Sequence, residues 1–114
     1  MEPIKVLVVD EDILVRRAIT NILDLNEEFE VCWLADGGEQ IESVLHEKYP
    51  DVVLLSIDSM ESPGLTILSK LRINFPNLPV IAVSPRNEEG AEAAINALRL
   101  GAVDFISKPA HKKH

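Results

Sequence analysis

Cysteine, aromatic residues and long apolar runs are all scarce in this sequence, and each scarcity excludes a class of protein. The single cysteine, Cys32, cannot form a disulfide bond within the chain, and the N-terminal segment lacks the pattern of a secretory signal, so we expect a reducing cytoplasm. No apolar run approaches the roughly 20 residues that cross a bilayer, so no membrane association is predicted. Basic residues are also few, with 11 lysines and arginines against 19 acidic residues. The net charge of -8 would repel a phosphate backbone, and direct binding of nucleic acid is not expected.

The residues that are present predict one domain built from repeated β–α units. The chain has 114 residues, of which 46% are hydrophobic, as in an ordinary soluble globular protein. Short apolar runs alternate along the chain with helical patterns, which indicates a parallel sheet. We expect strands at 5–9, 29–35, 51–57, 79–83 and 103–106, a turn at 36–38, and helices at 12–25, 41–49, 63–75 and 91–100.

The alternation stops after the fifth predicted strand, where a fifth helix would be due. The domain is therefore assigned to residues 1–109, and 110–114 are interpreted as the start of a linker, a truncated fifth helix or an added tail. Because right-handed crossovers place helices on both faces of such a sheet, the missing helix should leave apolar surface on the fourth and fifth strands uncovered.

Chemically distinctive residues follow four of the five predicted strands. They are Asp10 and Glu11 after the first strand, Ser56 at the end of the third strand with Asp58 after it, Ser84 after the fourth and Lys108 after the fifth. Open α/β sheets bind ligands at the carboxyl ends of their strands, so these side chains should form one site. Carboxylates are ligands that Mg²⁺ prefers, while a lysine and a hydroxyl can bind phosphoryl oxygens. The set favours phosphoryl chemistry, although the two adjacent acids alone are also typical of a helix N-terminus.

Four segments of the sequence, VLVVDED, PDVVLLSID, PVIAVSP and GAVDFISKP, resemble in order and spacing the receiver domain of bacterial two-component response regulators. The resemblance covers residues 4–109, and ALRLGAVDFISKPA is most similar to receivers attached to chemotaxis methylesterases. It implies a three-layer, doubly wound α/β fold of the flavodoxin-like type, with a five-stranded parallel sheet in the order 2-1-3-4-5. It also implies a part in phosphorelay signalling.

The resemblance further implies roles for the residues at the strand ends. Asp10 and Glu11 match the acid pair that holds Mg²⁺, Ser84 matches the switch hydroxyl, Lys108 matches the lysine that bridges to the phosphoryl group, and Phe105 matches the aromatic switch position. Pro109 matches a proline whose preceding peptide bond is usually cis.

One position departs from the family pattern, because Ser56 stands where the phosphate-accepting aspartate should end the third strand. An ionised aspartate attacks a phosphohistidine directly, whereas a serine hydroxyl needs a general base and yields a stable ester. We therefore interpret the chain as a degenerate receiver that is not itself an enzyme and regulates an attached or partner output domain by protein–protein interaction. The sequence leaves open whether Ser56 is natural or was introduced to hold the domain in one state.

Asp58 supports an alternative, since its carboxylate can partly replace the lost ligand. Weakened Mg²⁺ binding through Asp10, Glu11 and Asp58 is then expected. The alternative function is a receiver competent for phosphotransfer, with Mg²⁺ and with Asp58 or Ser56 as the acceptor. The resemblance also implies partners, namely a histidine kinase or another signalling protein, an output domain, and a second copy bound through the face of the fourth helix and fifth strand.

Overall fold

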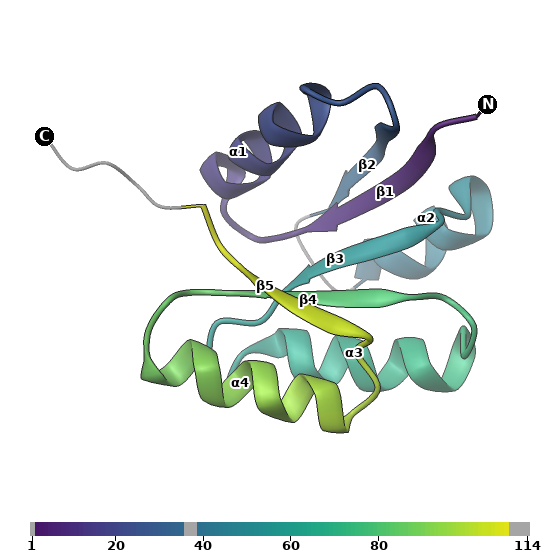
Figure 1. Ribbon diagram of the computed structural model, residues 1–114. Helices are drawn as coiled ribbons and strands as arrows, with labels where there is room; N and C mark the ends of the chain where they lie inside the picture. Colours follow the sequence, from purple (N-terminus) through teal and green to yellow (C-terminus); the bar gives the residue numbers. More distant parts are fainter. Residues whose placement is uncertain (1, 36–38, 110–114) are drawn as a thin grey trace, which may run out of the picture.

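Five parallel strands form a single sheet in the order β2-β1-β3-β4-β5 (Figure 1). The computed structural model describes residues 2–35 and 39–109, so the turn predicted at 36–38 and the segment 110–114 lie outside the described residues. The strands are β1 (Ile4–Val9), β2 (Phe29–Ala35), β3 (Val52–Ser56), β4 (Val80–Ser84) and β5 (Asp104–Ser107), and the helices are α1 (Ile13–Asp24), α2 (Glu39–Lys48), α3 (Pro63–Asn74) and α4 (Glu88–Arg99). The predicted fold class and strand order are confirmed.

The apolar residues of the central strands point alternately into two cores, as the pleat of a strand requires. In β1, Leu7 and Val9 belong to the core that α2, α3 and α4 cover, while Val6 and Val8 belong to the core under α1. A strand with helices on both faces buries every side chain, which is why it appears in the sequence as a continuous apolar run. The described helices thus divide three to one between the two faces.

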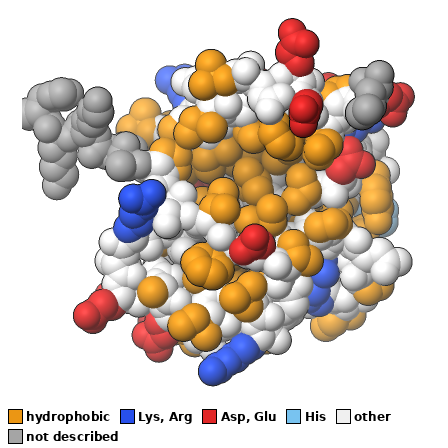
Figure 2. All heavy atoms as spheres, viewed as in Figure 1, with side chains coloured by type: hydrophobic (Ala, Val, Ile, Leu, Met, Phe, Trp, Pro, Cys, Tyr) orange, Lys and Arg blue, Asp and Glu red, His pale blue; other side chains and the backbone are white. Residues whose placement is uncertain are grey.

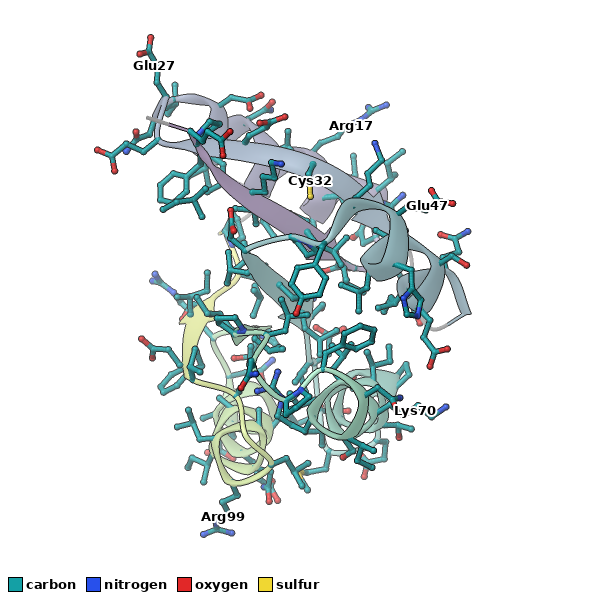
Figure 3. All side chains as sticks on the ribbon, turned by 90° about the vertical axis from the view of Figure 1, so that its right-hand side faces the viewer. Arg17, Glu27, Cys32, Glu47, Lys70 and Arg99 are labelled. Carbon is teal, nitrogen blue, oxygen red and sulfur yellow. The ribbon has the colours of Figure 1, made fainter. Side chains whose placement is uncertain are left out.

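The face that carries α1 is incompletely covered. Among the described residues no helix follows β5, and Figure 2 shows hydrophobic side chains gathered between α1 and α4. Ile22 of α1 and Ile106 of β5 both line a cavity there and are 55% and 44% exposed. The uncovered apolar surface expected on the fifth strand is therefore present, but the expectation for the fourth strand is wrong, because Val83, on the same face of β4, is 1% exposed. Charged side chains such as Arg17, Glu47 and Arg99 project outward from the ribbon (Figure 3).

Side-chain caps determine where the helices begin. Asp12 caps α1, because its side chain accepts a hydrogen bond from the backbone N–H of Leu14 at 2.8 Å. Asn87 caps α4 in the same way, accepting from Gly90 at 2.7 Å, and α4 therefore begins earlier than its apolar pattern predicts. Gly101 follows the end of α4 with a φ of 112°, a left-handed conformation that favours glycine. Across the described ranges, none of these helices has the length and apolar character needed to cross a membrane.

Candidate functional site

Four of the predicted site residues line one cavity of about 330 Å³ at the carboxyl ends of β1 and β3. Asp10 and Glu11 follow β1, Ser56 is the last residue of β3, and Asp58 lies in the loop that leads to α3. Strands β1 and β3 are neighbours in the sheet and diverge to helices on opposite faces, so their ends form the crevice where open α/β folds bind ligands. The structure thus brings the predicted carboxylates and the Ser56 hydroxyl to one place.

Asp10 is the most buried acid of the site, with an exposed fraction of 5%. Its Oδ1 accepts a hydrogen bond from the backbone N–H of Asp12 at 2.8 Å, whereas its Oδ2 has no hydrogen-bond partner among the described residues. The Nζ of Lys108 lies 3.2 Å from that Oδ2 and supplies the opposite charge that a buried carboxylate needs. Arg16 donates to the carbonyl oxygens of Asp10 and Glu11, at 2.5 and 3.3 Å, and so holds the backbone of the acidic turn.

Lys108 joins the ends of β5 and β3. Its backbone N–H donates to the carbonyl oxygen of Ser84 at 2.8 Å, which fixes the lysine beside the end of β4. Its ammonium contacts the carboxylates of both Asp10 and Asp58, and its side chain is only 15% exposed. The expected cis peptide bond before Pro109 is wrong, because no peptide bond in the described ranges is cis. The lysine reaches the acids because the pairing with Ser84 already directs its backbone toward them.

The acids around Lys108 change its protonation. Burial alone would lower the pKa of the ammonium, but the hydrogen bond to Asp58 and the negative charges of Asp10 and Asp58 outweigh burial and raise the pKa above 10.5. The site therefore holds a firmly charged lysine between two carboxylates.

This raised pKa predicts a loss of stability at high pH. A group whose pKa is higher in the folded state contributes stability that is fully present below its unfolded pKa and lost as the pH rises through its folded pKa. We expect the free energy of unfolding, measured by urea titration between about pH 9 and 12, to fall more steeply for the native chain than for Lys108→Gln. Lys70→Gln, at an exposed lysine of α3, should behave like the native chain. Parallel curves for the native chain and Lys108→Gln would contradict the role of Lys108.

Ser84 lies beside this cavity rather than in it. The residue ends β4, is 4% exposed and lines a neighbouring cavity together with Phe105. Its carbonyl oxygen accepts the hydrogen bond from Lys108, but the residue lines a cavity together with residues at the start of α4. The structure therefore brings together Asp10, Glu11, Ser56, Asp58 and Lys108 and places Ser84 next to Lys108, whereas Phe105 lines the neighbouring cavity with Ser84.

Residues of α3 that the sequence analysis missed complete the wall of the cavity. Thr66 and Lys70 lie one helical turn apart, and both line it together with Gly64. The available signal was the four-residue spacing of Thr66 and Lys70, which places two polar groups on one side of a helix that starts beside Ser56. Lys70 adds a cation to a cavity that is otherwise acidic.

Comparison with known proteins identifies the family. The model of the response regulator receiver domain matches residues 6–114 of the chain. The chain belongs to the response regulator receiver domain family. Receiver domains take part in two-component signalling and interact with histidine kinases and output domains.

This receiver is similar to part of each of several protein-glutamate methylesterases/protein-glutamine glutaminases. It is 37% identical to a protein-glutamate methylesterase/protein-glutamine glutaminase of Trichodesmium erythraeum, over 97% of this chain and 32% of the relative. It is 45% identical to protein-glutamate methylesterase/protein-glutamine glutaminase 3 of Rhodospirillum rubrum, over 92% of this chain and 28% of the relative. The crystal structure of the response regulator domain of Thermotoga maritima CheB matches with 37% identity and a TM-score of 0.79, over 95% of this chain and 80% of that one. The predicted likeness to methylesterase receivers is confirmed, and the chain spans less than a third of the length of these two curated relatives.

Receiver domains generally bind Mg²⁺, and the donor set of this receiver fits such an ion in part. The buried Oδ2 of Asp10, which lacks a hydrogen-bond partner, is a suitable anionic ligand, and Glu11 and Asp58 line the same cavity. Yet within 2–35 and 39–109 no three acidic, histidine or cysteine side chains converge closely enough to hold one metal ion. Asp58 points to Lys108 instead. Weak binding through Asp10, Glu11 and Asp58 stays a prediction.

Proposed function

We propose that this receiver is not switched by phosphorylation of an aspartate and acts through protein–protein contacts that regulate an attached or partner output domain. One observation supports the proposal above all. The residue at the end of β3 is a serine, while the ammonium of Lys108 is already paired with Asp10 and Asp58. The end of β3 therefore offers no carboxylate to the cavity, and Lys108 is neutralised without a phosphoryl group.

The pairing of Asp58 with Lys108 also bears on metal binding. A carboxylate that neutralises an ammonium must leave it to become a metal ligand, so Lys108 competes with Mg²⁺ for Asp58, and also for Asp10. Asp10 and Glu11 would hold the ion, and its charge would stabilise phosphoryl oxygens when bound. We therefore expect weakened affinity for Mg²⁺, because Ser56 contributes no negative charge to the site and Asp58 is paired with Lys108.

The surface of α4 and β5 is the proposed contact for partners, including a second copy of the chain. Ile95 and Leu98 of α4 and Val103 and Phe105 beside it are 51%, 39%, 59% and 45% exposed. Exposed apolar side chains gathered on one face are typical of interaction sites. We assign the receiver domain to residues 1–109 and place its action in the cytoplasm, with a histidine kinase or another signalling protein as partner.

The proposal predicts that the native chain takes up no phosphoryl group. We expect its intact mass to remain unchanged after incubation with acetyl phosphate and Mg²⁺, because the hydroxyl of Ser56 needs a general base to become a nucleophile. Asp58→Ala and Ser56→Ala serve as matched variants. A gain of one phosphoryl group that Asp58→Ala abolishes and hydroxylamine removes would show an acyl phosphate on Asp58. A stable adduct lost in Ser56→Ala would show a serine ester, and either result would replace the proposal by the phosphotransfer alternative.

A further inference from the structure

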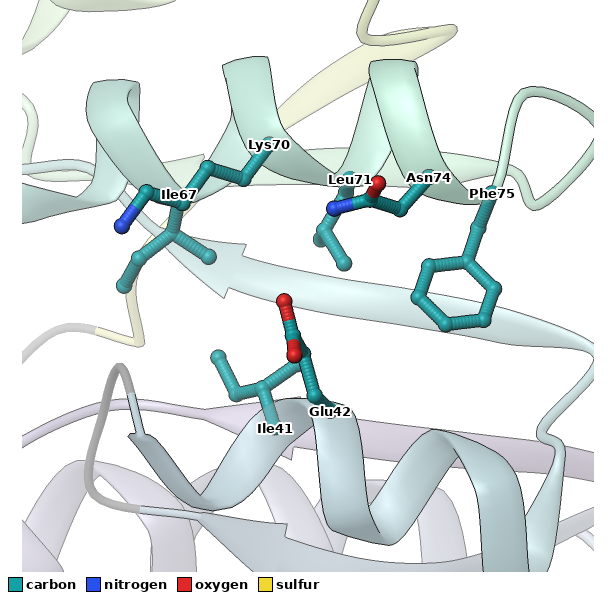
Figure 4. Close-up of a pocket in the computed structure, with 7 residues that line it drawn as sticks. All are labelled: Ile41, Glu42, Ile67, Lys70, Leu71, Asn74 and Phe75. Atoms are coloured by element: carbon teal, nitrogen blue, oxygen red, sulfur yellow. The ribbon is translucent and has the colours of Figure 1, made fainter.

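A second cavity lies between α2 and α3, and no part of the proposed function uses it. Its volume is about 370 Å³, within the range of cavities that bind small molecules. Its floor is apolar: Ile41 of α2 and Leu71 of α3 are 2% and 3% exposed and belong to the core, and Ile67 and Phe75 pack against that core. Figure 4 shows these side chains converging from the two helices on a gap above the sheet.

Two opposite charges stand at this cavity without partners of their own. Glu42 extends from α2 toward α3, and Lys70 extends from α3 (Figure 4). Neither side chain forms an ion pair or a side-chain hydrogen bond with any described residue, and both are exposed. Asn74 adds an amide to the same wall. A cavity with an apolar floor and a few convergent polar groups has the composition of a ligand site.

The order of these groups along the cavity restricts the ligand. Figure 4 shows the ammonium of Lys70 at the end away from Phe75, the carboxylate of Glu42 between them, and the Phe75 ring at the opposite end. The rings of His46 and Tyr49 pack against Phe75, with centroids 5.7 and 6.4 Å away, and so support that apolar end. A simple carboxylate would meet repulsion from Glu42, and a simple amine would meet repulsion from Lys70. A zwitterion with an apolar side chain can pair with both Glu42 and Lys70 and can also bury that side chain against the apolar floor of the cavity.

We propose that the cleft between α2 and α3 binds a small apolar α-amino acid, with its carboxylate at Lys70, its ammonium at Glu42 and its side chain against Leu71 and Phe75. Lys70 and Ile67 also line the cavity that holds Asp10 and Ser56, so the ligand would lie beside the receiver site without entering it. This site does not depend on whether the receiver is phosphorylated.

The test is a titration of the ¹⁵N-labelled chain with L-leucine and, separately, L-phenylalanine, followed by two-dimensional NMR. We expect saturable shifts confined to backbone amides of α2 and α3 that border the cleft, with a dissociation constant on the order of 1 mM, as suits a ligand of few atoms held at an open site. Leucinamide lacks the carboxylate and N-acetylleucine lacks the ammonium, so each should bind at least about threefold more weakly, as the loss of one exposed charge pair predicts.

Variants localise the binding to the cleft. Lys70→Gln and Glu42→Gln should each weaken binding of leucine about three- to fivefold, since each removes one exposed charge pair. Asn74→Phe places a ring in the cleft from an exposed position of α3 and should abolish binding while leaving the fold intact. Glu47→Gln, the same chemical change on α2 away from the cleft, should leave the affinity unchanged. Absence of localised shifts up to about 20 mM, or equal binding of leucine by the Asn74→Phe variant, would overturn the proposal.

Discussion

Ser56→Asp is expected to be phosphorylated in the presence of Mg²⁺, whereas the native chain, as we propose, takes up no phosphoryl group. The introduced carboxylate would stand at the end of β3, in the cavity that Asp10, Glu11 and Asp58 already line. An ionised carboxylate needs no general base, so one of its oxygens can attack the phosphorus of acetyl phosphate while the bond to the acetate oxygen breaks and acetate leaves. We expect intact mass to show one added phosphoryl group on Ser56→Asp under conditions that leave the mass of the native chain unchanged.

The reasoning depends on the neighbours of residue 56 rather than on the substitution alone. Lys108 lies near enough to contact Asp10 and Asp58 with one ammonium, and the same cation can neutralise a phosphoryl group on a third carboxylate. The introduced charge would also compete with Asp58 for Lys108, which frees Asp58 as a candidate metal ligand. The gain should therefore depend on both Lys108 and Mg²⁺.

Two matched variants distinguish chemistry from shape. Ser56→Asn has nearly the shape of the aspartate variant without its charge and should remain unphosphorylated. Adding Lys108→Gln to Ser56→Asp should lower the phosphorylated fraction, because the phosphoryl charge then lacks its ammonium partner. If Ser56→Asp stays unmodified while its melting curve shows a folded protein, the cavity differs from an active receiver at more than one position.

The sheet could be predicted because each of its strands carries its own local signal. Val6 and Val8 face one core and Leu7 and Val9 the other, so β1 had to be apolar at every position and short enough to be a strand. Helix boundaries were harder, as α4 shows: its first turn is polar and is specified by the Asn87 cap rather than by apolar spacing. The uncovered face beside Ile106 followed from counting helices against strands.

The sequence predicts which residues of the site are neighbours only where those residues adjoin the ends of strands. Asp10 and Ser56 adjoin β1 and β3, and the sheet order alone makes them neighbours. The pairing of Lys108 with Asp58 was not predictable, because it joins residues 50 positions apart through the conformation of a loop that no local pattern specifies. The cleft between α2 and α3 was equally hidden, since the spacing of two helices depends on side chains from both. The order of the strands thus determines which residues lie near the site, whereas the packing of loops and side chains determines which charged groups pair.

Gly64→Ala is expected to have a large effect on stability, and its physical cause lies at the site itself. A Cβ atom at residue 64 would lie 2.3 Å from the carbonyl oxygen of Ser56 and 2.8 Å from Cγ1 of Ile57. The first of these neighbours is backbone at the end of β3 and cannot rotate away. The start of α3 and the end of β3 must therefore separate, at a cost of about 2 to 3 kcal/mol in the free energy of unfolding. Thermal unfolding should show a fall in Tm of roughly 10 °C.

Thr66→Ala provides the matched control, because Thr66 lines the same cavity from an exposed position of α3, where a methyl group meets no backbone. Its Tm should stay close to that of the native chain, since alanine also favours a helix. In the Ser56→Asp background, Gly64→Ala should in addition lower phosphorylation, because moving α3 shifts the wall of the cavity relative to Asp10 and Lys108. Equal melting temperatures for Gly64→Ala and Thr66→Ala would mean that the close contact between α3 and the end of β3 does not constrain the site.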